Sequence, residues 1–276
     1  MKKTVLDIEY LQSKFSFFKT RLGVYLSKKI IRWTAFDKVN RIHGNHYTLR
    51  GSAFTTAMLS DPLMDVSYEV HNREILEQLP EGAFITVSNH PIGSLDGIIL
   101  IDIFASIRPD FKVMVNEMLS HISAMGDNFI SVIPKTDSNQ ESNNKNTNGI
   151  RLSLSQIRGG HPMGFFPAGA MSFYNKKMKK VRDLPWTHSI IRLIRKANVP
   201  VIPVYFDCTN SKSFYRLGRI SWKLRSIFVA REAFNKKGRT LHVYLGNPIP
   251  PENIKSKPND KELADFLYNS TYNIKK

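Results

Sequence analysis

The chain has little cysteine and no long hydrophobic run, and both absences narrow what it can be. Its single cysteine, Cys208, excludes an internal disulfide framework. No stretch approaches the roughly 18 to 20 consecutive apolar residues that a membrane-spanning helix needs. The first residues run from two lysines into the acidic Asp7 and Glu9, and not into the apolar core of a signal peptide. We therefore expect a chain that is neither exported by a visible signal nor integral to a membrane.

Acidic residues are scarce relative to basic ones. The 276 residues include 40 Lys and Arg but 23 Asp and Glu, which gives a formal net charge of +17. Such a charge attracts polyanions: nucleic acid, an anionic membrane surface or an acidic carrier protein. Charge alone does not choose among these partners. The apolar content of 42% is sufficient for one large α/β domain.

The first part of the chain carries an amphipathic pattern. Apolar residues recur at steps of three and four, which predicts one helix over residues 11–30. They are Leu11, Phe15, Phe18, Leu22, Tyr25, Leu26 and Ile30, with lysines and arginines between them. This face can lie in a membrane interface or pack on the protein core, and the pattern favours neither. We place an N-terminal helical segment at residues 1–70, ahead of a main domain at residues 71–276.

The middle of the chain alternates short apolar runs with helical patterns. The runs predict strands buried on both faces, at residues 83–87, 111–115, 129–133, 163–166 and 199–206. Helical spacing occurs at residues 95–107, 117–125, 150–158 and 189–197. The alternation predicts an α/β fold, an open and mostly parallel sheet flanked by helices, with its functional site at the carboxyl ends of the strands. Residues 136–148 contain no apolar side chain, and we expect a mobile surface loop there.

One strand-to-helix corner brings together a histidine and a carboxylate. The strand that ends before His90 is followed by a turn at Pro91 and Gly93. Ser94 is then the expected N-cap of a helix that carries Asp96 in its first turn. A carboxylate on one ring nitrogen fixes the tautomer of a histidine, which can then act as a general base. A structural explanation also remains open, in which the histidine bonds to the turn and the carboxylate favours the helix dipole. The sequence has no Gly-x-Ser-x-Gly elbow, so a serine hydrolase of the α/β type has no visible nucleophile.

The corner resembles a known family. The residues Asn89-His90-Pro91-Ile92-Gly93-Ser94-Leu95-Asp96-Gly97 resemble the first motif of the glycerolipid acyltransferase superfamily, in the variant of lysophospholipid acyltransferase-like proteins often labelled hemolysin-related. The common pattern has four residues between His and Asp, and the Pro-x-Gly turn of the variant accounts for the fifth residue here. Further blocks follow in the family's order. They are Asp127-Asn128-Phe129-Ile130, Val132-Ile133-Pro134, Phe165-Phe166-Pro167-Ala168-Gly169-Ala170-Met171-Ser172, Val199 to Phe206, Asn210-Ser211 with Phe214, and Arg231-Glu232.

The resemblance implies a reaction and a preferred acceptor. Members that form phosphatidic acid carry Phe-Pro-Glu-Gly followed by Thr-Arg, whose charged residues hold the glycerol phosphate, whereas this chain has Ala168, Ala170 and Met171. Neither alanine nor methionine can hold a phosphate as Arg does. Unless cations such as Lys176, Lys177 or Arg151 replace them, the implied acceptor is a lyso-aminolipid, lyso-ornithine or lyso-glycine lipid. The alternative is a 1-acylglycerol-3-phosphate acyltransferase, and a more distant one is a basic nucleic-acid-binding protein.

The resemblance also implies the site residues and the co-substrate. In the implied mechanism His90 removes the acceptor's hydroxyl proton, Asp96 orients the ring, and the hydroxyl oxygen attacks a fatty acyl thioester of acyl carrier protein or coenzyme A. No cofactor, covalent intermediate or metal is implied, and His43 and His46 lack further ligands at a suitable spacing. Amides around Gly169 are the hypothesised oxyanion donors. Residues expected to bind substrate are Asn89, Gly93, Phe166, Pro167, Gly169, Ser172, Asn210 and Ser211.

Basic and aromatic residues cluster after the third block. The basic ones are Lys176, Lys177, Lys179, Lys180, Arg182, Lys212, Arg216, Arg219, Lys223 and Arg225, and Phe173, Tyr174, Phe214, Tyr215 and Trp222 lie among them. This mixture suits a solvated basic face, single-stranded nucleic acid, or anionic lipid headgroups and acyl carrier protein. We favour lipid and carrier, without nucleic acid or metal. On this interpretation residues 1–70 dock on the membrane, residues 71–276 are the catalytic domain, and the protein is peripheral at the cytoplasmic face of the inner membrane.

Overall fold

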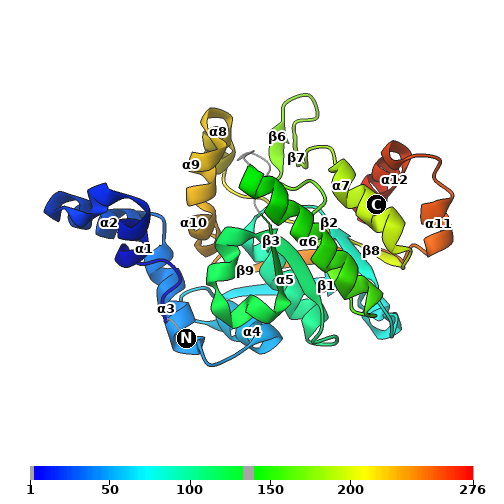
Figure 1. The fold of residues 1–276 in the computed structure, drawn as a ribbon, viewed down its shortest axis with the longest axis horizontal. Coiled ribbons are helices and arrows are strands. Elements are labelled where there is room, and N and C mark those ends of the chain that lie inside the picture. The colour runs from blue at the N-terminus through cyan, green and yellow to red at the C-terminus, as the bar shows by residue number, and fades with distance from the viewer. Residues whose placement is uncertain (1–2, 133–139, 276) are drawn as a thin grey trace.

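A seven-stranded sheet forms the centre of the protein. The computed structural model describes residues 3–132 and 140–275 (Figure 1). The strand order is β1-β9-β8-β2-β5-β3-β4. All neighbouring pairs are parallel except β8 and β9, so the predicted open, mostly parallel sheet is confirmed. The strands are β1 (Val66–His71), β2 (Ile85–Ser88), β3 (Lys112–Asn116), β4 (Phe129–Val132), β5 (Met163–Phe165), β8 (Val201–Asp207) and β9 (Arg239–Leu245).

The five predicted strands correspond to β2, β3, β4, β5 and β8, with ends shifted by one or two residues. The end predicted for the third strand, residue 133, lies outside the described residues. The sequence patterns did not single out β1 and β9. Their buried positions alternate with exposed or half-buried ones, because these two strands pack on the core by one face. A separate hairpin joins β6 (Phe173–Asn175) to β7 (Lys180–Arg182).

Helices cover both faces of the sheet and create two apolar cores. On one face, α4 and α5 pack with the side chains of Phe84, Val204 and Phe206. On the other face, α6, α7 and α12 pack with Ile85 and Val87. The helices of the first face are α3 (Phe36–His46), α4 (Gly51–Ser60), α5 (Ser94–Ala105) and α10 (Val229–Phe234). Those of the second face are α6 (Gln140–Arg158), α7 (His188–Ala197) and α12 (Asp260–Tyr272).

Three of the predicted helices are confirmed: 95–107 as α5, which ends two residues earlier, 150–158 as the last part of α6, and 189–197 as α7. The helix predicted at 117–125 is wrong, because the chain there forms two 3₁₀ helices, η3 (Glu117–His121) and η4 (Ser123–Asn128). The loop predicted at 136–148 is wrong from residue 140 onward, and residues 136–139 lie outside the described part. The polar run begins α6, whose later turns are held by Ile157 in the second core. The apolar second half of α6 packs on the core and stabilises the whole helix, although the sequence of its polar first half does not predict a helix.

The N-terminal segment is helical but is not one helix. Phe15 is extended and Thr20 caps a new start, so the predicted helix over 11–30 divides into α1 (Ile8–Lys14), η1 (Ser16–Lys19) and α2 (Arg21–Trp33). The predicted boundary between residues 70 and 71 falls inside β1, and the division into two functional segments stays a prediction. Within residues 3–132 and 140–275 we find no helix with the length and apolar character needed to cross a membrane.

The remaining short elements lie around the sheet. In Figure 1, α1 and α2 extend to one side of the sheet, beside the column of α8, α9 and α10. The ring of Trp33, at the end of α2, meets that of Phe228 edge to face at 4.5 Å between centroids, which joins the two groups of helices. The elements not yet given are η2 (Arg73–Gln78), α8 (Lys212–Ile220), α9 (Trp222–Ile227) and α11 (Pro251–Lys255).

Candidate active site

The histidine and the carboxylate of the predicted corner meet. Nδ1 of His90 lies 2.9 Å from Oδ2 of Asp96. The Asp96 side chain is fully buried, whereas 19% of the His90 side chain is exposed. An ionised carboxylate can only accept, so Nδ1 of the neutral ring carries the proton and Nε2 carries the lone pair. In the described part of the chain Nε2 has no hydrogen-bond partner, and it is available as a base.

The turn before α5 is built around the same carboxylate oxygen. Oδ2 of Asp96 also accepts hydrogen bonds from the amides of Ile92 at 3.0 Å and Gly93 at 2.9 Å. Gly93, and not the expected Ser94, is the N-cap of the helix, with φ of 101°. A Cβ at Gly93 would lie 2.7 Å from Sδ of Met171. Both the backbone angle and the lack of space require glycine, which explains how the five-residue interval still places Asp96 against the ring.

The loop after β5 lies against the histidine ring. The ring of Phe166 is 4.3 Å from that of His90, centroid to centroid, at an interplanar angle of 30°. Pro167 accepts a backbone hydrogen bond from Thr187. Gly169 has φ of 65° and donates its own amide to the carbonyl of Phe166 at 2.9 Å. The amide of Gly169 is therefore occupied by the turn, and any oxyanion donors in this loop must be its neighbours.

A second buried carboxylate fixes the backbone of His90. Oδ1 of Asp183 accepts a hydrogen bond from the His90 amide at 3.2 Å and another from the hydroxyl of Ser172. The Ser172 amide in turn donates to the His90 carbonyl at 2.8 Å. Burial raises the pKa of Asp183 above its usual value, against these donors, which lower it. Ser172 is 1% exposed, so it supports the loop from behind. The sequence carried no motif that would single out Asp183.

Asn89 joins two strands. Its Nδ2 donates to the carbonyl of Phe206 at 3.0 Å, and its Oδ1 accepts from the Phe206 amide at 2.7 Å. The side chain is 3% exposed. Both polar atoms of the Asn89 side chain are thus bonded to the backbone of β8. The sequence predicted that Asn89 binds substrate, whereas in the structure it joins β2 to β8 behind His90.

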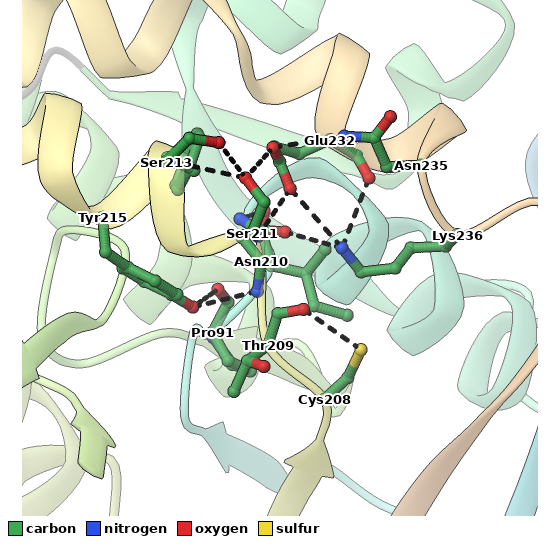
Figure 2. Close-up of polar contacts among 12 residues, drawn as sticks. Pro91, Cys208, Thr209, Asn210, Ser211, Ser213, Tyr215, Glu232, Asn235 and Lys236 are labelled. Carbon is green, nitrogen blue, oxygen red and sulfur yellow. Dashed lines mark hydrogen bonds and ion pairs between the residues drawn. The ribbon is translucent and has the colours of Figure 1, made fainter. Parts of the chain in front are cut away.

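Asn210 and Tyr215 hold the turn from the other side (Figure 2). Nδ2 of Asn210 donates to the carbonyl of Ile92 at 2.9 Å, and the Tyr215 hydroxyl donates to the carbonyl of Pro91 at 3.1 Å. The backbone amide of Asn210 also donates to the Tyr215 hydroxyl. Burial raises the pKa of Tyr215, so the phenol stays protonated and remains a donor. The two carbonyls preceding Gly93 are thereby fixed.

A buried ion pair completes this network. Nζ of Lys236 lies 3.0 Å from Oδ1 of Asn210 and 3.7 Å from Oε2 of Glu232 (Figure 2). Glu232 accepts from the amide and the hydroxyl of Ser211, which also caps α8. The Lys236 side chain is 2% exposed, a location that a lysine occupies only when paired. Asn210 and Ser211 thus lie in the framework behind the turn, and Lys236 was not found from the sequence.

One arginine reaches the loop that lacks the family's charged residues. Arg225 donates from Nη1 to the carbonyl of Ser172 at 3.0 Å and from Nη2 to the carbonyl of Met171 at 3.2 Å. It is 9% exposed, and burial lowers its pKa. Within the described residues no carboxylate pairs with it. The sequence had placed Arg225 merely in a basic run. Lys176 and Lys177 lie between the strands of the β6–β7 hairpin.

Cys208 lies near this site without the environment of a nucleophile. Burial raises the pKa of its thiol, and its Sγ contacts the carbonyl of Thr209 at 3.8 Å. A protonated thiol is a poor nucleophile. Among the described side chains near the corner, the ring of His90 remains the group suited to move a proton.

Comparisons with known proteins place the chain in a family. A family model described as "Acyltransferase" matches residues 15–276. A protein of Bacteroides thetaiotaomicron named "Lyso-glycine lipid O-acyltransferase" is 26% identical over 255 residues, which cover 90% of this chain and 88% of that protein. A protein of the same name from Phocaeicola vulgatus is 26% identical over 207 residues, covering 72% and 71%. A solved structure of the 1-acyl-sn-glycerophosphate acyltransferase PlsC from Thermotoga maritima aligns with a TM-score of 0.49 and 15% identity, over 97% of this chain and 92% of that one.

Proposed function

The chain belongs to the acyltransferase family, and from this premise we propose that it moves a fatty acyl group from a thioester to the hydroxyl of a lyso-glycine lipid. The observation that carries the proposal is the contact of His90 and Asp96, in which one ring nitrogen is tied to a buried carboxylate and the other is unoccupied. The similarity to two lyso-glycine lipid O-acyltransferases over most of the chain supports the acceptor.

In the proposed mechanism His90 first acts as a base. Nε2 takes the proton of the acceptor hydroxyl while the oxygen attacks the thioester carbonyl, and Asp96 stabilises the imidazolium. The tetrahedral intermediate then expels the thiolate, which receives the proton from His90. The ester and the free thiol of the carrier are the products, and no cofactor is consumed. We assign the oxyanion to the amides of Ala168 and Ala170, because the amide of Gly169 is used by the turn.

The loop after β5 offers one cation to the headgroup of an acceptor. Ala168 and Met171 cannot clamp a phosphate, whereas the guanidinium of Arg225 lies directly behind the Met171 carbonyl. A buried cation without a carboxylate partner is costly, and an anion at this loop would offset that cost. A guanidinium binds a carboxylate or a phosphate, so the glycine headgroup is assigned from the two relatives and from the missing charged residues of the loop.

The test combines purified protein with acyl thioesters of carrier protein or of coenzyme A and with two acceptors. Lyso-glycine lipid should yield the diacylated product by mass spectrometry, and lysophosphatidate should react far more slowly. Release of thiol without acceptor would indicate hydrolysis and contradict the proposal, as would a preference for lysophosphatidate. His90→Ala should abolish transfer. A variant that retained transfer would exclude the assigned base. The faster thioester identifies the donor, which we propose is acyl carrier protein because its acidic surface complements the charge of +17.

We propose further that α2 and α9 rest on an anionic membrane surface, which is the cytoplasmic face of the inner membrane. Large apolar side chains are exposed on both helices, for example 61% of Trp33, 55% of Tyr25 and 43% of Leu224. Basic residues of α2 lie among them: Arg21, Lys28, Lys29 and Arg32. Exposed aromatics beside lysines and arginines are typical of interfacial docking.

Vesicle flotation tests the docking surface. The protein should float with vesicles containing anionic lipid and less with neutral ones, and salt should weaken the binding. Trp33→Ser with Tyr25→Ser should release the protein. Leu152→Ser is the matched control, because Leu152 is 44% exposed on α6, away from α2 and α9. Equal flotation of the double variant and the control would contradict this surface.

A further inference from the structure

We propose that Glu69, His71 and His242 bind one Zn²⁺ ion on the two strands at the edge of the central sheet. The three side chains come from β1 and β9 and offer two imidazole nitrogens and one carboxylate oxygen, all within 4.8 Å of one another. The site belongs to neither the His90 corner nor its supporting network, since β9 and β8 separate β1 from β2.

Strand register places the three side chains together. Glu69 and His71 are two residues apart on β1 and therefore project from the same face of the sheet. The parallel partner of Glu69 on β9 is His242. Three ligands from two adjacent strands are thus presented by rigid backbone, which reduces the cost of ordering them when an ion binds.

Two potential ligand atoms converge on one ring nitrogen of His242. Nδ1 of His242 lies 3.0 Å from Nε2 of His71 and 3.4 Å from Oε2 of Glu69. A neutral ring nitrogen carries either a proton or a lone pair, so without an ion a single hydrogen on Nδ1 has to serve both neighbours. A metal ion bound to all three atoms satisfies every one of them at once.

The spacing of the atoms fits zinc. Ligands about 2.0–2.2 Å from a tetrahedral zinc ion lie about 3.3–3.6 Å from one another. Nδ1 of His242 lies 3.0 Å from Nε2 of His71 and 3.4 Å from Oε2 of Glu69, close to this range, so small side-chain rotations would bring the set onto the ion. Imidazole with one carboxylate suits zinc better than magnesium or calcium, which prefer oxygen ligands. The exposure of Glu69, at 58%, leaves room for water as the fourth ligand.

Neighbouring contacts orient the ligands and indicate what the ion would do. The ring of Tyr244 stacks on His71 at 4.2 Å with an interplanar angle of 9°. Nδ2 of Asn72 donates to the carbonyl of Leu245 at 2.7 Å and ties the end of β1 to the end of β9. Since β1 is an edge strand that follows α1 to α4, a zinc ion here would clip the N-terminal helices to the sheet. The expected consequence is a higher melting temperature with zinc.

The test is zinc binding to the full-length protein in a buffer that does not chelate metals. Titration calorimetry, with zinc content measured after dialysis, should show one ion per chain. His71→Ala and His242→Ala should each weaken binding at least about tenfold, since even loss of a partner that merely orients a ligand costs about 10–100-fold. Zinc should raise the melting temperature of the wild type and not of these variants.

A matched control separates this site from adventitious binding to surface histidines. His188 is 62% exposed and forms an ion pair with Asp260, so it offers the same ligand types without a second imidazole. His188→Ala should bind zinc like the wild type. X-ray absorption should show two imidazole nitrogens on the bound zinc. Absence of saturable binding, or binding undiminished in both His71→Ala and His242→Ala, would overturn the proposal, and Glu69→Gln provides a third variant should either histidine variant fail to fold.

Discussion

Replacement of Asp96 by Asn isolates the charge of the carboxylate that orients His90. The amide has the same shape and keeps one oxygen to accept from Nδ1 of His90 and from the amides of Ile92 and Gly93, all now within 3.0 Å of Oδ2. Its NH₂ group would occupy the place of Oδ1, which is buried and has no hydrogen-bond partner. The substitution therefore removes the negative charge and adds an unsatisfied buried donor.

The size of both effects follows from this geometry. Unit charges about 4 Å apart interact by about 4 kcal/mol at an effective dielectric constant of roughly 20. The attraction develops as the imidazolium forms, so its loss falls on the transition state. Losing most of it lowers kcat by about 10²–10³-fold while KM changes little. The unsatisfied NH₂ group should also lower the free energy of unfolding by about 1–3 kcal/mol.

The assay is acyl transfer at saturating acceptor, together with chemical denaturation. Asp102→Asn is the control, because Asp102 lies on the same helix, is 7% exposed and accepts from Thr55, Thr56 and Tyr68 without contacting His90. It should lose stability and keep its kcat. If Asp96→Asn retained kcat within tenfold of the wild type, or if both variants lost kcat equally, the reasoning about the orienting charge would be refuted.

Three further substitutions test the framework of the turn. Gly93→Ala introduces a Cβ 2.7 Å from Sδ of Met171 at φ of 101°, so the free energy of unfolding should fall by about 1–3 kcal/mol. Adding Met171→Ala should restore only the part lost to the clash, because the backbone strain remains. Lys236→Met leaves a buried carboxylate without its cation and should cost about 3–5 kcal/mol in denaturation, and unchanged stability would show that the pair contributes nothing. Tyr215→Phe removes the hydrogen-bond partner of the Pro91 carbonyl and of the Asn210 backbone amide. The free energy of unfolding should fall by about 1–3 kcal/mol, and a wild-type denaturation midpoint would contradict the network.

The fold could be predicted where burial leaves a local pattern. Strands buried on both faces, such as β2 and β8, appear as continuous apolar runs, and α5 and α7 show helical spacing of apolar residues. The one-sided strands β1 and β9 and the polar start of α6 lack such a signal. Their conformation depends on partners distant in the chain, because β1 pairs with a strand some 170 residues later.

By itself, the sequence determined the corner in which His90 meets Asp96, the proposed base and its orienting carboxylate. His90 and Asp96 are six residues apart on one turn and helix start, so local geometry alone brings them together, with Gly93 absorbing the extra residue. The tertiary structure decided what holds that corner. Asp183 is 93 residues from its partner His90, and Lys236 is 26 residues from its partner Asn210. No local spacing in the sequence indicates that these pairs meet, because each contact closes a loop of the chain. The same reason hid the histidine pair of β1 and β9, whose members are separated by 171 residues.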